Sequence, residues 1–484
     1  MKINLKNTHL TIRSISLLWF MLLFSESTQA QDATITIHLR GVYESKISLL
    51  PLTGAIAMKP LEIVDNVKNG ETTLLKISKD NLPGEFVLRF DYKENAASTP
   101  YPSEKRIIIY KQDLDLWVHP IYCNSTDSTW FQKDERENTA YIRFLQVNAR
   151  QKEKLGLLQN FLMNYDDTNS SFYREGITEY EKRRKVCNQW IAAQTKQYKA
   201  LFVSSIFGFH HVPQISWKGT EADRKNNLRE KYFDEMDFSD TLMLKTTNMK
   251  EWMDAYVNLF GELATSIFLR DSLFTFAGKT AIEKARTGHP LVYGWMVDYF
   301  YNGYESFNIE KGIKILQPYL DDPNCLTSKR QAINRRLKGI ETLVPGTTAP
   351  NIIMQDAENK PFELNAFQTE KDYILLLFWS ADCSHCTETV GKLYPWYNNA
   401  EVQDRLDIVA ISLDETDNEI YSWQQKINEL KGWTNLRAAE GLRSKVAAEY
   451  YILGVPVMIL LNAKTKEIIV LPESIEQMNE LINL

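Results

Sequence analysis

Hydrophobic and polar residues alternate with a period of two over the first part of the chain. Ile35, Ile37 and Leu39 alternate with polar neighbours, and short runs of the same kind recur, separated in places by turn residues such as Pro83-Gly84. Such alternation is typical of strands that bury one face. The pattern predicts a β-sandwich-like domain over residues 31–137. Because this region has no glycine-rich phosphate loop or nucleophile motif, we interpret it as a docking or folding module. The further runs are 46–50, 72–78, 85–92, 106–110 and 114–118.

From about residue 138 to 343 the apolar residues recur at helical spacing. The segments 140–163, 179–203 and 249–259 are long and contain few helix breakers. This spacing predicts a helical domain over residues 138–343, without a clear fixed-period repeat. Eight aromatic residues in it could line a peptide-binding groove, although packing in a core is the usual role of such residues. They are Trp252, Tyr256, Tyr293, Trp295, Tyr299, Phe300, Tyr301 and Tyr304.

The last part of the chain alternates between strands and helices. A breaker-rich linker at 344–350 precedes two continuous apolar runs, 373–379 (YILLLFW) and 406–413 (LDIVAISL), which are typical of strands buried in a central sheet. The pattern predicts an α/β domain over residues 344–484. The fold class is therefore multidomain α+β, with a β-sandwich-like N-terminal domain, a helical middle region and a C-terminal α/β domain.

Composition and charge narrow the range of partners. The 484 residues are 44% apolar and 24% charged, which is ordinary globular composition, and 56 Lys+Arg against 62 Asp+Glu give a formal net charge of −6. An acidic chain of this kind carries no basic footprint for nucleic acid. We therefore expect no nucleic-acid partner.

The first thirty residues are expected to direct export. Lys2, Lys6 and Arg13 precede a ten-residue apolar run, and Ala30 offers a small residue for cleavage. The apolar run is half the length that a spanning helix needs, which is about 20 residues. The sequence thus predicts a signal peptide over residues 1–30, cleavage near Ala30, a periplasmic location and no membrane span after cleavage.

Two of the five cysteines form the motif Cys383-Ser384-His385-Cys386, which follows a predicted buried strand and begins a predicted helix. The free N–H groups of a helix N-terminus favour a thiolate, and only a thiolate attacks a disulfide at a useful rate. We assign Cys383 as the nucleophile and Cys386 as the resolving thiol. A half zinc site would need a second pair of ligands, and none lies nearby in the sequence. We therefore expect no metal and no cofactor besides a redox-active Cys383–Cys386 disulfide.

Four stretches carry a family resemblance: Ala349-Pro350, the FWSADCSHC run that ends at Cys386, a strand that ends VAISLDE, and Gly454-Val455-Pro456. Residues 344–484 resemble a secreted thioredoxin-like domain of the TlpA/ResA group. The resemblance implies protein thiols and disulfides as substrates, together with a membrane electron donor or acceptor. It also implies that Pro456 lies opposite the CxxC motif and that the Val455 backbone pairs with a bound peptide. Less specifically, the first two regions resemble extensions found before such domains in exported proteins of gram-negative bacteria.

The sequence departs from that family at the positions that handle protons. Leu377 stands where a buried Asp is common, Thr389 where a Glu is common, and Gly391 where a proline is usual. The proton acceptor for Cys386 is then Glu388, Asp382 or water. His385 replaces the proline of reducing thioredoxins, and we hypothesise that its ring stabilises the Cys383 thiolate and makes the pair more oxidising. The alternative is a solvated histidine of little effect.

The remaining candidates are weaker. Cys123, Cys187 and Cys325 are expected to be buried single thiols, with a Cys187–Cys325 bridge as an alternative. His210 and His211 could bind a metal, but adjacent ring nitrogens point apart in regular structure and no other ligand is evident.

Two classes of function compete. The first is an exported thiol–disulfide oxidoreductase that acts on proteins as a reductase, oxidase or isomerase. The second is a substrate-binding or assembly protein whose thioredoxin-like domain is an accessory redox switch. A peroxidase is a third and weaker option, because Leu376 and Ser380 stand where peroxiredoxin-type sites have Pro and Thr.

Overall fold

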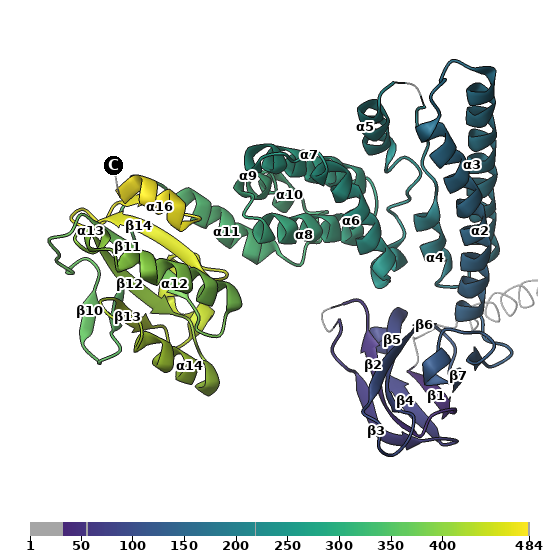
Figure 1. Cartoon of the computed structure of the whole chain (residues 1–484), viewed down its shortest axis with the longest axis horizontal. Helices are drawn as coiled ribbons and strands as arrows, with labels where there is room; N and C mark the ends of the chain where they lie inside the picture. Colours follow the sequence, from purple (N-terminus) through teal and green to yellow (C-terminus); the bar gives the residue numbers. More distant parts are fainter. Residues whose placement is uncertain (1–31, 55–56, 218, 483–484) are drawn as a thin grey trace, which may run out of the picture. The chain divides into compact units, whose positions relative to one another are not determined.

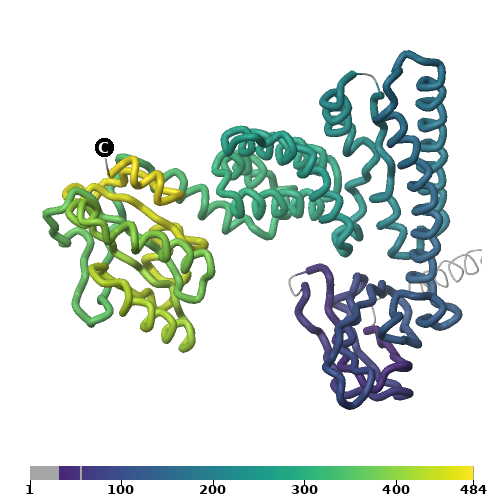
Figure 2. Tube along the Cα trace, in the orientation of Figure 1, coloured from purple at the N-terminus to yellow at the C-terminus, as the bar shows by residue number. Residues whose placement is uncertain are grey.

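The chain forms two compact units in the computed structural model, which describes residues 32–54, 57–217 and 219–482. Unit 1 holds the described residues up to Leu263 together with Thr287–Val292, and unit 2 holds Ala264–Arg286 together with Tyr293 onward. Figures 1 and 2 follow the chain through both units by colour. The segment 138–343, predicted as one helical domain, is thus divided between the units. The predicted signal peptide (1–30) lies outside the described residues.

The N-terminal part of unit 1 consists of strands in two four-stranded sheets, with orders β4-β1-β7-β8 and β3-β2-β5-β6. Strand β1 pairs in parallel with β7 and antiparallel with β4. Inward side chains of both sheets, such as Ile35 of β1 and Leu88 of β5, join one buried cluster. The strands are β1 (Ala33–Leu39), β2 (Glu44–Pro51), β3 (Glu62–Lys68), β4 (Thr72–Ile77), β5 (Gly84–Lys93), β6 (Tyr101–Ile109), β7 (Leu114–Val118) and β8 (Trp130–Phe131).

Helices make up the rest of unit 1. The two longest, α2 and α3, lie side by side in Figures 1 and 2 and contact each other along their lengths. Aromatic side chains fill the space between them and α4, with Phe144 stacked on Phe207 at 4.0 Å between ring centroids. At the start of α2, the buried Glu137 carboxylate accepts hydrogen bonds from the N–H groups of Phe202 and Val203, each 3.0 Å long. The helices are α2 (Glu137–Asn164), α3 (Ser171–Gln197), α4 (Ser204–Phe207), α5 (Glu221–Lys231) and α6 (Thr247–Gly261).

Unit 2 begins with a second set of helices. Of the eight aromatic residues considered for a groove, five are buried, including Tyr256 at 0% and Tyr293 at 1% exposure, whereas Trp252, Trp295 and Tyr299 are partly exposed. The eight therefore do not form one exposed surface. The helices are α7 (Ile267–Ala285), α8 (Pro290–Ser306, which begins in the part assigned to unit 1), α9 (Glu310–Lys314), α10 (Gln317–Leu320) and α11 (Arg330–Thr342).

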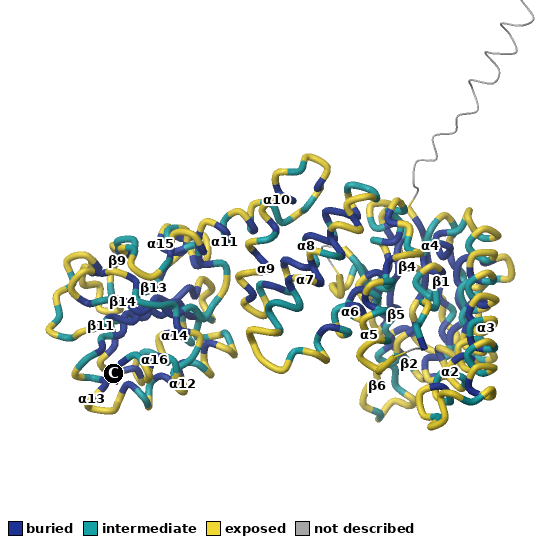
Figure 3. The backbone as a smooth tube through the Cα atoms, turned by 90° about the horizontal axis from the view of Figure 1, so that it is seen from above, coloured by how far each residue is buried: buried dark blue, intermediate teal, exposed yellow. Residues whose placement is uncertain are grey.

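A five-stranded sheet, ordered β13-β12-β11-β14-β15, forms the centre of the C-terminal domain. Strands β11, β12 and β13 are parallel, and β14 and β15 run antiparallel to their neighbours. Successive residues of β11 enter different cores: Leu376 belongs to the cluster on one face and Leu377 to the cluster on the other. The buried band through this domain is dark blue in Figure 3. The strands are β9 (Ile353–Gln355), β10 (Pro361–Glu363), β11 (Tyr373–Trp379), β12 (Leu406–Ser412), β13 (Thr434–Arg437), β14 (Val457–Asn462) and β15 (Ile468–Val470).

Helices cover this sheet: α12 (Ser384–Tyr397), α13 (Ala400–Gln403), α14 (Asp417–Ile427), α15 (Lys445–Glu449) and α16 (Ile475–Ile482). The predicted mixture of α and β structure, the helical middle region and the C-terminal α/β domain are confirmed. Among the residues that the structure describes, no helix is both long and apolar enough to cross a membrane.

We expect Glu137→Ala to loosen the segment that begins α4. The substitution leaves two buried N–H donors without their acceptor, at a cost of about 2 kcal/mol, or roughly 30-fold faster local exchange. Hydrogen exchange of the Phe202 and Val203 amides in the full chain measures this effect. Glu153→Ala, an exposed acid on the same helix, is the control and should leave both rates unchanged. Equal exchange in the two variants would show that the carboxylate does not hold this segment.

Candidate redox site

Cys383 lies at the start of α12, directly after the loop that leaves β11. It is the N-cap residue of the helix, with extended backbone (φ −91°, ψ 119°). Its Sγ accepts the N–H of Cys386 at 3.4 Å. This donor is one of the helix N-terminal N–H groups that have no partner within the helix. The Cys383 Sγ therefore lies next to this donor, at the N-terminal end of the α12 dipole.

The two cysteines differ in exposure. Cys383 is partly exposed, whereas Cys386 is fully buried in the core on the α12 side of the sheet. Burial strongly raises the pKa of the Cys386 thiol, and its hydrogen bond with Cys383 and the charge of Asp414 raise it further, against a backbone hydrogen bond at Ser380 that lowers it. A soluble reagent can therefore reach Cys383 but not Cys386.

The loop before β14 faces Cys383. The Val455–Pro456 peptide bond is cis, and the Val455 carbonyl oxygen lies 3.8 Å from the Cys383 Sγ, which donates to it. The Val455 N–H makes no hydrogen bond within the described residues. The structure thus brings together three residues of the predicted site, Cys383, Val455 and Pro456, across a narrow gap between two loops.

A buried carboxylate, Asp414, holds the loop that carries Cys383. It is 1% exposed and follows β12, whose last residue pairs with Trp379 at the end of the parallel strand β11. Its Oδ1 accepts the Ser380 hydroxyl at 2.5 Å, and both of its oxygens accept the Ala381 N–H at 3.2 and 3.1 Å. The Ser412 hydroxyl donates to Oδ2 at 2.7 Å. The loop is therefore fixed three residues before the nucleophile.

Asp414 lies in the VAISLDE stretch but was not among the residues predicted for the site. The sequence nevertheless contains a signal for Asp414, because the carboxyl ends of adjacent parallel strands meet at one edge of a sheet. An acid directly after the second buried strand therefore lies next to a motif that follows the first.

The other predicted residues lie on the surface. Asp382, His385 and Glu388 are exposed. Glu388 pairs with Lys392 at 2.7 Å, and this contact lowers its pKa. Thr389, at the position where the family often has Glu, donates its hydroxyl to the His385 carbonyl at 2.9 Å. The buried acid whose charge acts on Cys386 is thus Asp414 rather than Glu388 or Asp382.

The remaining cysteines and histidines do not join this site. Cys123, Cys187 and Cys325 are buried with free thiols, so the alternative Cys187–Cys325 bridge is absent in this structure. His210 contacts Asn148 at 3.1 Å, and His211 contacts Glu235 at 3.0 Å. Across the ranges that the structure covers, no cluster of His, Cys, Asp or Glu could hold a metal ion.

The fold and the site together define a thioredoxin-like domain, and residues 371–468 match the family model described as thioredoxin-like. The chain is 34% identical over 80 residues to the thiol-disulfide oxidoreductase ResA of Bacillus thuringiensis subsp. konkukian (strain 97-27), and equally to that of Bacillus cereus (strain ATCC 10987 / NRS 248). Each match covers 16% of this chain and 43% of the relative, so less than half the length of these relatives is spanned.

Two solved structures are also similar. The first is a thioredoxin-like protein from Bacteroides caccae ATCC 43185, with 19% identity and a TM-score of 0.37 over 55% of this chain and 94% of that chain. The second is a domain of a possible thiol-disulfide isomerase from Cytophaga hutchinsonii ATCC 33406. It has 26% identity and a TM-score of 0.26 over 29% of this chain and 92% of that chain.

We expect Asp414→Asn to lower the pKa of the Cys386 thiol, because the substitution removes a negative charge that raises it. With a small aromatic disulfide as probe, Cys383 releases the first coloured thiolate and Cys386 the second. A lower pKa increases the fraction of Cys386 that is thiolate at neutral pH, so the second release should be faster than in the native chain. Asp417→Asn, an exposed acid in the first turn of α14, is the control. A second release that is unchanged or slower in Asp414→Asn would contradict the electrostatic role of Asp414.

Proposed function

We propose that the chain is an exported thiol–disulfide oxidoreductase that exchanges disulfides with protein substrates through Cys383 and Cys386. The observation that carries this proposal is the partly exposed Cys383 Sγ at the N-terminus of α12, with the buried Cys386 one helical turn behind it. The matched relatives that are named thiol–disulfide oxidoreductases support the same class of activity.

In the reductive direction, the Cys383 thiolate attacks one sulfur of a client disulfide. The client S–S bond breaks, a mixed disulfide forms, and the other client sulfur leaves as a thiolate. The Cys386 thiolate then attacks Cys383 Sγ and expels the second client thiolate, so that two electrons pass to the client and a Cys383–Cys386 disulfide remains. Because Asp382 and Glu388 lie at the surface, the proton of Cys386 goes to water or to a departing client thiolate. The oxidative direction reverses these steps.

Val455 supplies the contact with the client backbone. Its N–H makes no hydrogen bond to any residue that the structure describes, and its carbonyl faces Cys383, so an extended client segment can add alongside it by main-chain hydrogen bonds. Such pairing depends little on client side chains. Pro456 shapes this loop in the proposed site.

Export belongs to the same proposal. The positively charged residues and the apolar run within residues 1–30 support export. An exported chain would work in the periplasm, where disulfides persist. A membrane electron donor or acceptor would reset the cysteine pair there. The two N-terminal sheets would act as a sandwich-like docking module.

We expect Cys383→Ser to abolish catalysed reduction of insulin by a dithiol, because the attacking thiolate is lost. Cys386→Ser should still attack but should accumulate mixed disulfides with clients that a reductant releases, since the resolving thiol is missing. Ser384→Ala, at an exposed position between the cysteines, is the matched control and should keep the native rate within about twofold. Turnover retained in Cys383→Ser would refute the assignment of the nucleophile.

We also expect the native cysteine pair to be more oxidising than that of His385→Pro, because in our hypothesis the His385 ring stabilises the Cys383 thiolate. A tenfold change in the exchange constant corresponds to about 30 mV, which equilibration with a glutathione buffer resolves. Thr387→Ala, another exposed position in the first turn of α12, should leave the potential unchanged. A native potential equal to or lower than that of His385→Pro would refute the role of His385.

A further inference from the structure

A cavity of about 260 Å³ opens among the helices of unit 1. Three aromatic side chains from different segments line it: Phe209, Tyr232 after α5, and Trp252 of α6. The Trp252 ring lies 4.9 Å from that of Tyr232 and 5.8 Å from that of Phe209, between ring centroids. The Tyr232 hydroxyl donates to the Trp252 carbonyl at 2.7 Å, which fixes both residues. The wall is thus a preformed aromatic surface with electron-rich faces.

The charged groups of this cavity favour a cation. Asp234 and Glu235 line it together with Lys231, so carboxylates outnumber ammonium groups. Glu235 Oε2 contacts His211 Nε2 at 3.0 Å, and its side chain is 60% exposed, while Oε1 makes no contact within the described ranges. Burial lowers the pKa of His211, while its contact with the Glu235 carboxylate acts in the opposite direction and raises it. The nearby cation Arg184 is already paired with Glu181.

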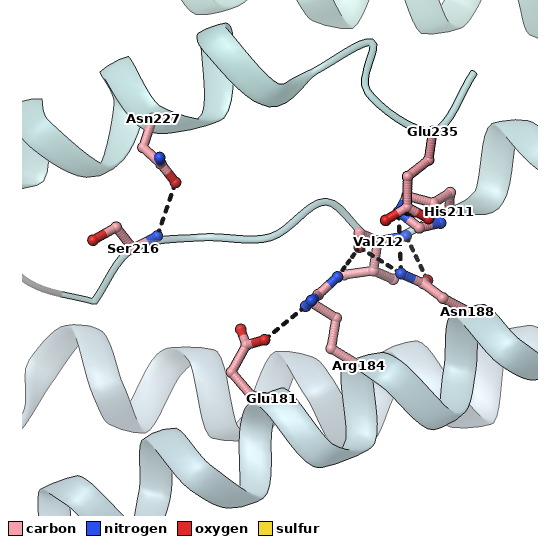
Figure 4. A network of polar contacts seen from close by, with 8 residues as sticks. All are labelled: Glu181, Arg184, Asn188, His211, Val212, Ser216, Asn227 and Glu235. Atoms are coloured by element: carbon pink, nitrogen blue, oxygen red, sulfur yellow. Dashed lines mark hydrogen bonds and ion pairs between the residues drawn. The ribbon is translucent and has the colours of Figure 1, made fainter. Parts of the chain in front are cut away.

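An extended segment, residues 212–216, passes along the cavity and is held at both ends by side chains (Figure 4). Asn188 of α3 accepts the Val212 N–H at 3.0 Å and donates to its carbonyl at 2.9 Å. At the other end, Asn227 of α5 accepts the Ser216 N–H at 3.1 Å. Between these anchors, Gln214 is exposed and lines the cavity, and neither its N–H nor its carbonyl makes a hydrogen bond in the described part of the chain.

We propose that the cavity binds an arginine side chain of an extended polypeptide, with the guanidinium against the Trp252 ring and paired with the Glu235 carboxylate, and the peptide backbone paired with Gln214. A guanidinium fits because it is planar, stacks on aromatic faces and donates to carboxylates in a fixed geometry. The main-chain N–H and carbonyl of Gln214 have no hydrogen-bond partner among the described residues, and this favours a polypeptide over a small cation. This site does not depend on the redox activity proposed for the cysteines.

Calorimetric titration of the full chain with two synthetic pentapeptides tests the proposal. One is acetyl-Thr-Val-Arg-Val-Thr-amide, and the other carries citrulline, a neutral isostere, in place of arginine. We expect the arginine peptide to bind at least tenfold more tightly. Glu235→Gln should remove that difference, whereas Glu230→Gln, an exposed acid on α5 outside the cavity, should keep it. Neither peptide contains cysteine, so the result does not depend on whether Cys383 and Cys386 turn over.

Three outcomes would overturn the proposal. Equal affinity for the two peptides would show that binding in the cavity does not depend on the positive charge of the guanidinium. Discrimination that survives in Glu235→Gln would place the charge recognition elsewhere. Equal affinity for acetyl-arginine amide and for the pentapeptide would exclude pairing with the Gln214 backbone.

Discussion

The start of α12 at Cys383 is the constraint on which the redox site depends. A helix N-terminus has N–H groups without partners inside the helix, and here one of them, that of Cys386, points at the Cys383 sulfur. The helix can begin at this residue because the preceding loop is tied down by the buried Asp414 carboxylate. Asp414 is in place because β12 runs parallel to β11 in register, with Ser412 opposite Trp379. The register of β12 against β11 therefore positions Asp414, Asp414 holds the loop, and the loop positions Cys383 at the start of α12.

Cys383 and Cys386 have the same side chain, and they differ in how far each is buried. Cys386 lies among apolar side chains, where the charged form of a thiol is poorly solvated, and the Asp414 charge disfavours that form further. Cys383 is accessible and receives a hydrogen bond that a thiolate would strengthen. In the proposed exchange a client therefore meets Cys383 first, and Cys386 acts after a mixed disulfide has formed beside it. The order of the two steps in the proposed exchange follows from the burial of Cys386 and the partial exposure of Cys383.

The sequence predicted the parts of this site whose signals are local. The runs at 373–379 and 406–413 are apolar enough to identify buried strands, and the cysteine spacing identifies the helix start. Which acidic residue lies near Cys386 depends on how the strands and helices pack against one another. The order of residues along the chain does not contain that information. Glu388 follows Cys386 by two residues, which is about 200° around a helix, so it must lie on the opposite side of α12, where it pairs with Lys392. Asp414 resembles an ordinary turn residue until the parallel pairing of β11 with β12 is known. The division of 138–343 between two units has the same origin, because helical spacing shows which face is buried but not which helix covers it.

Exchange and selection of clients place opposite demands on a binding surface. In the proposed exchange, the gap between Cys383 and Val455 would bind clients through their backbone, which almost any extended segment supplies, so it would select clients only weakly. A site that selects clients must bind particular side chains. The cavity near Trp252 presents aromatic and acidic groups that can do so. Two modules on one chain need no fixed orientation to cooperate, since a client held by one is presented to the other at an effective concentration set by the connecting chain. Weak binding in unit 1 would then be an advantage, because a client must leave once its thiols have been exchanged.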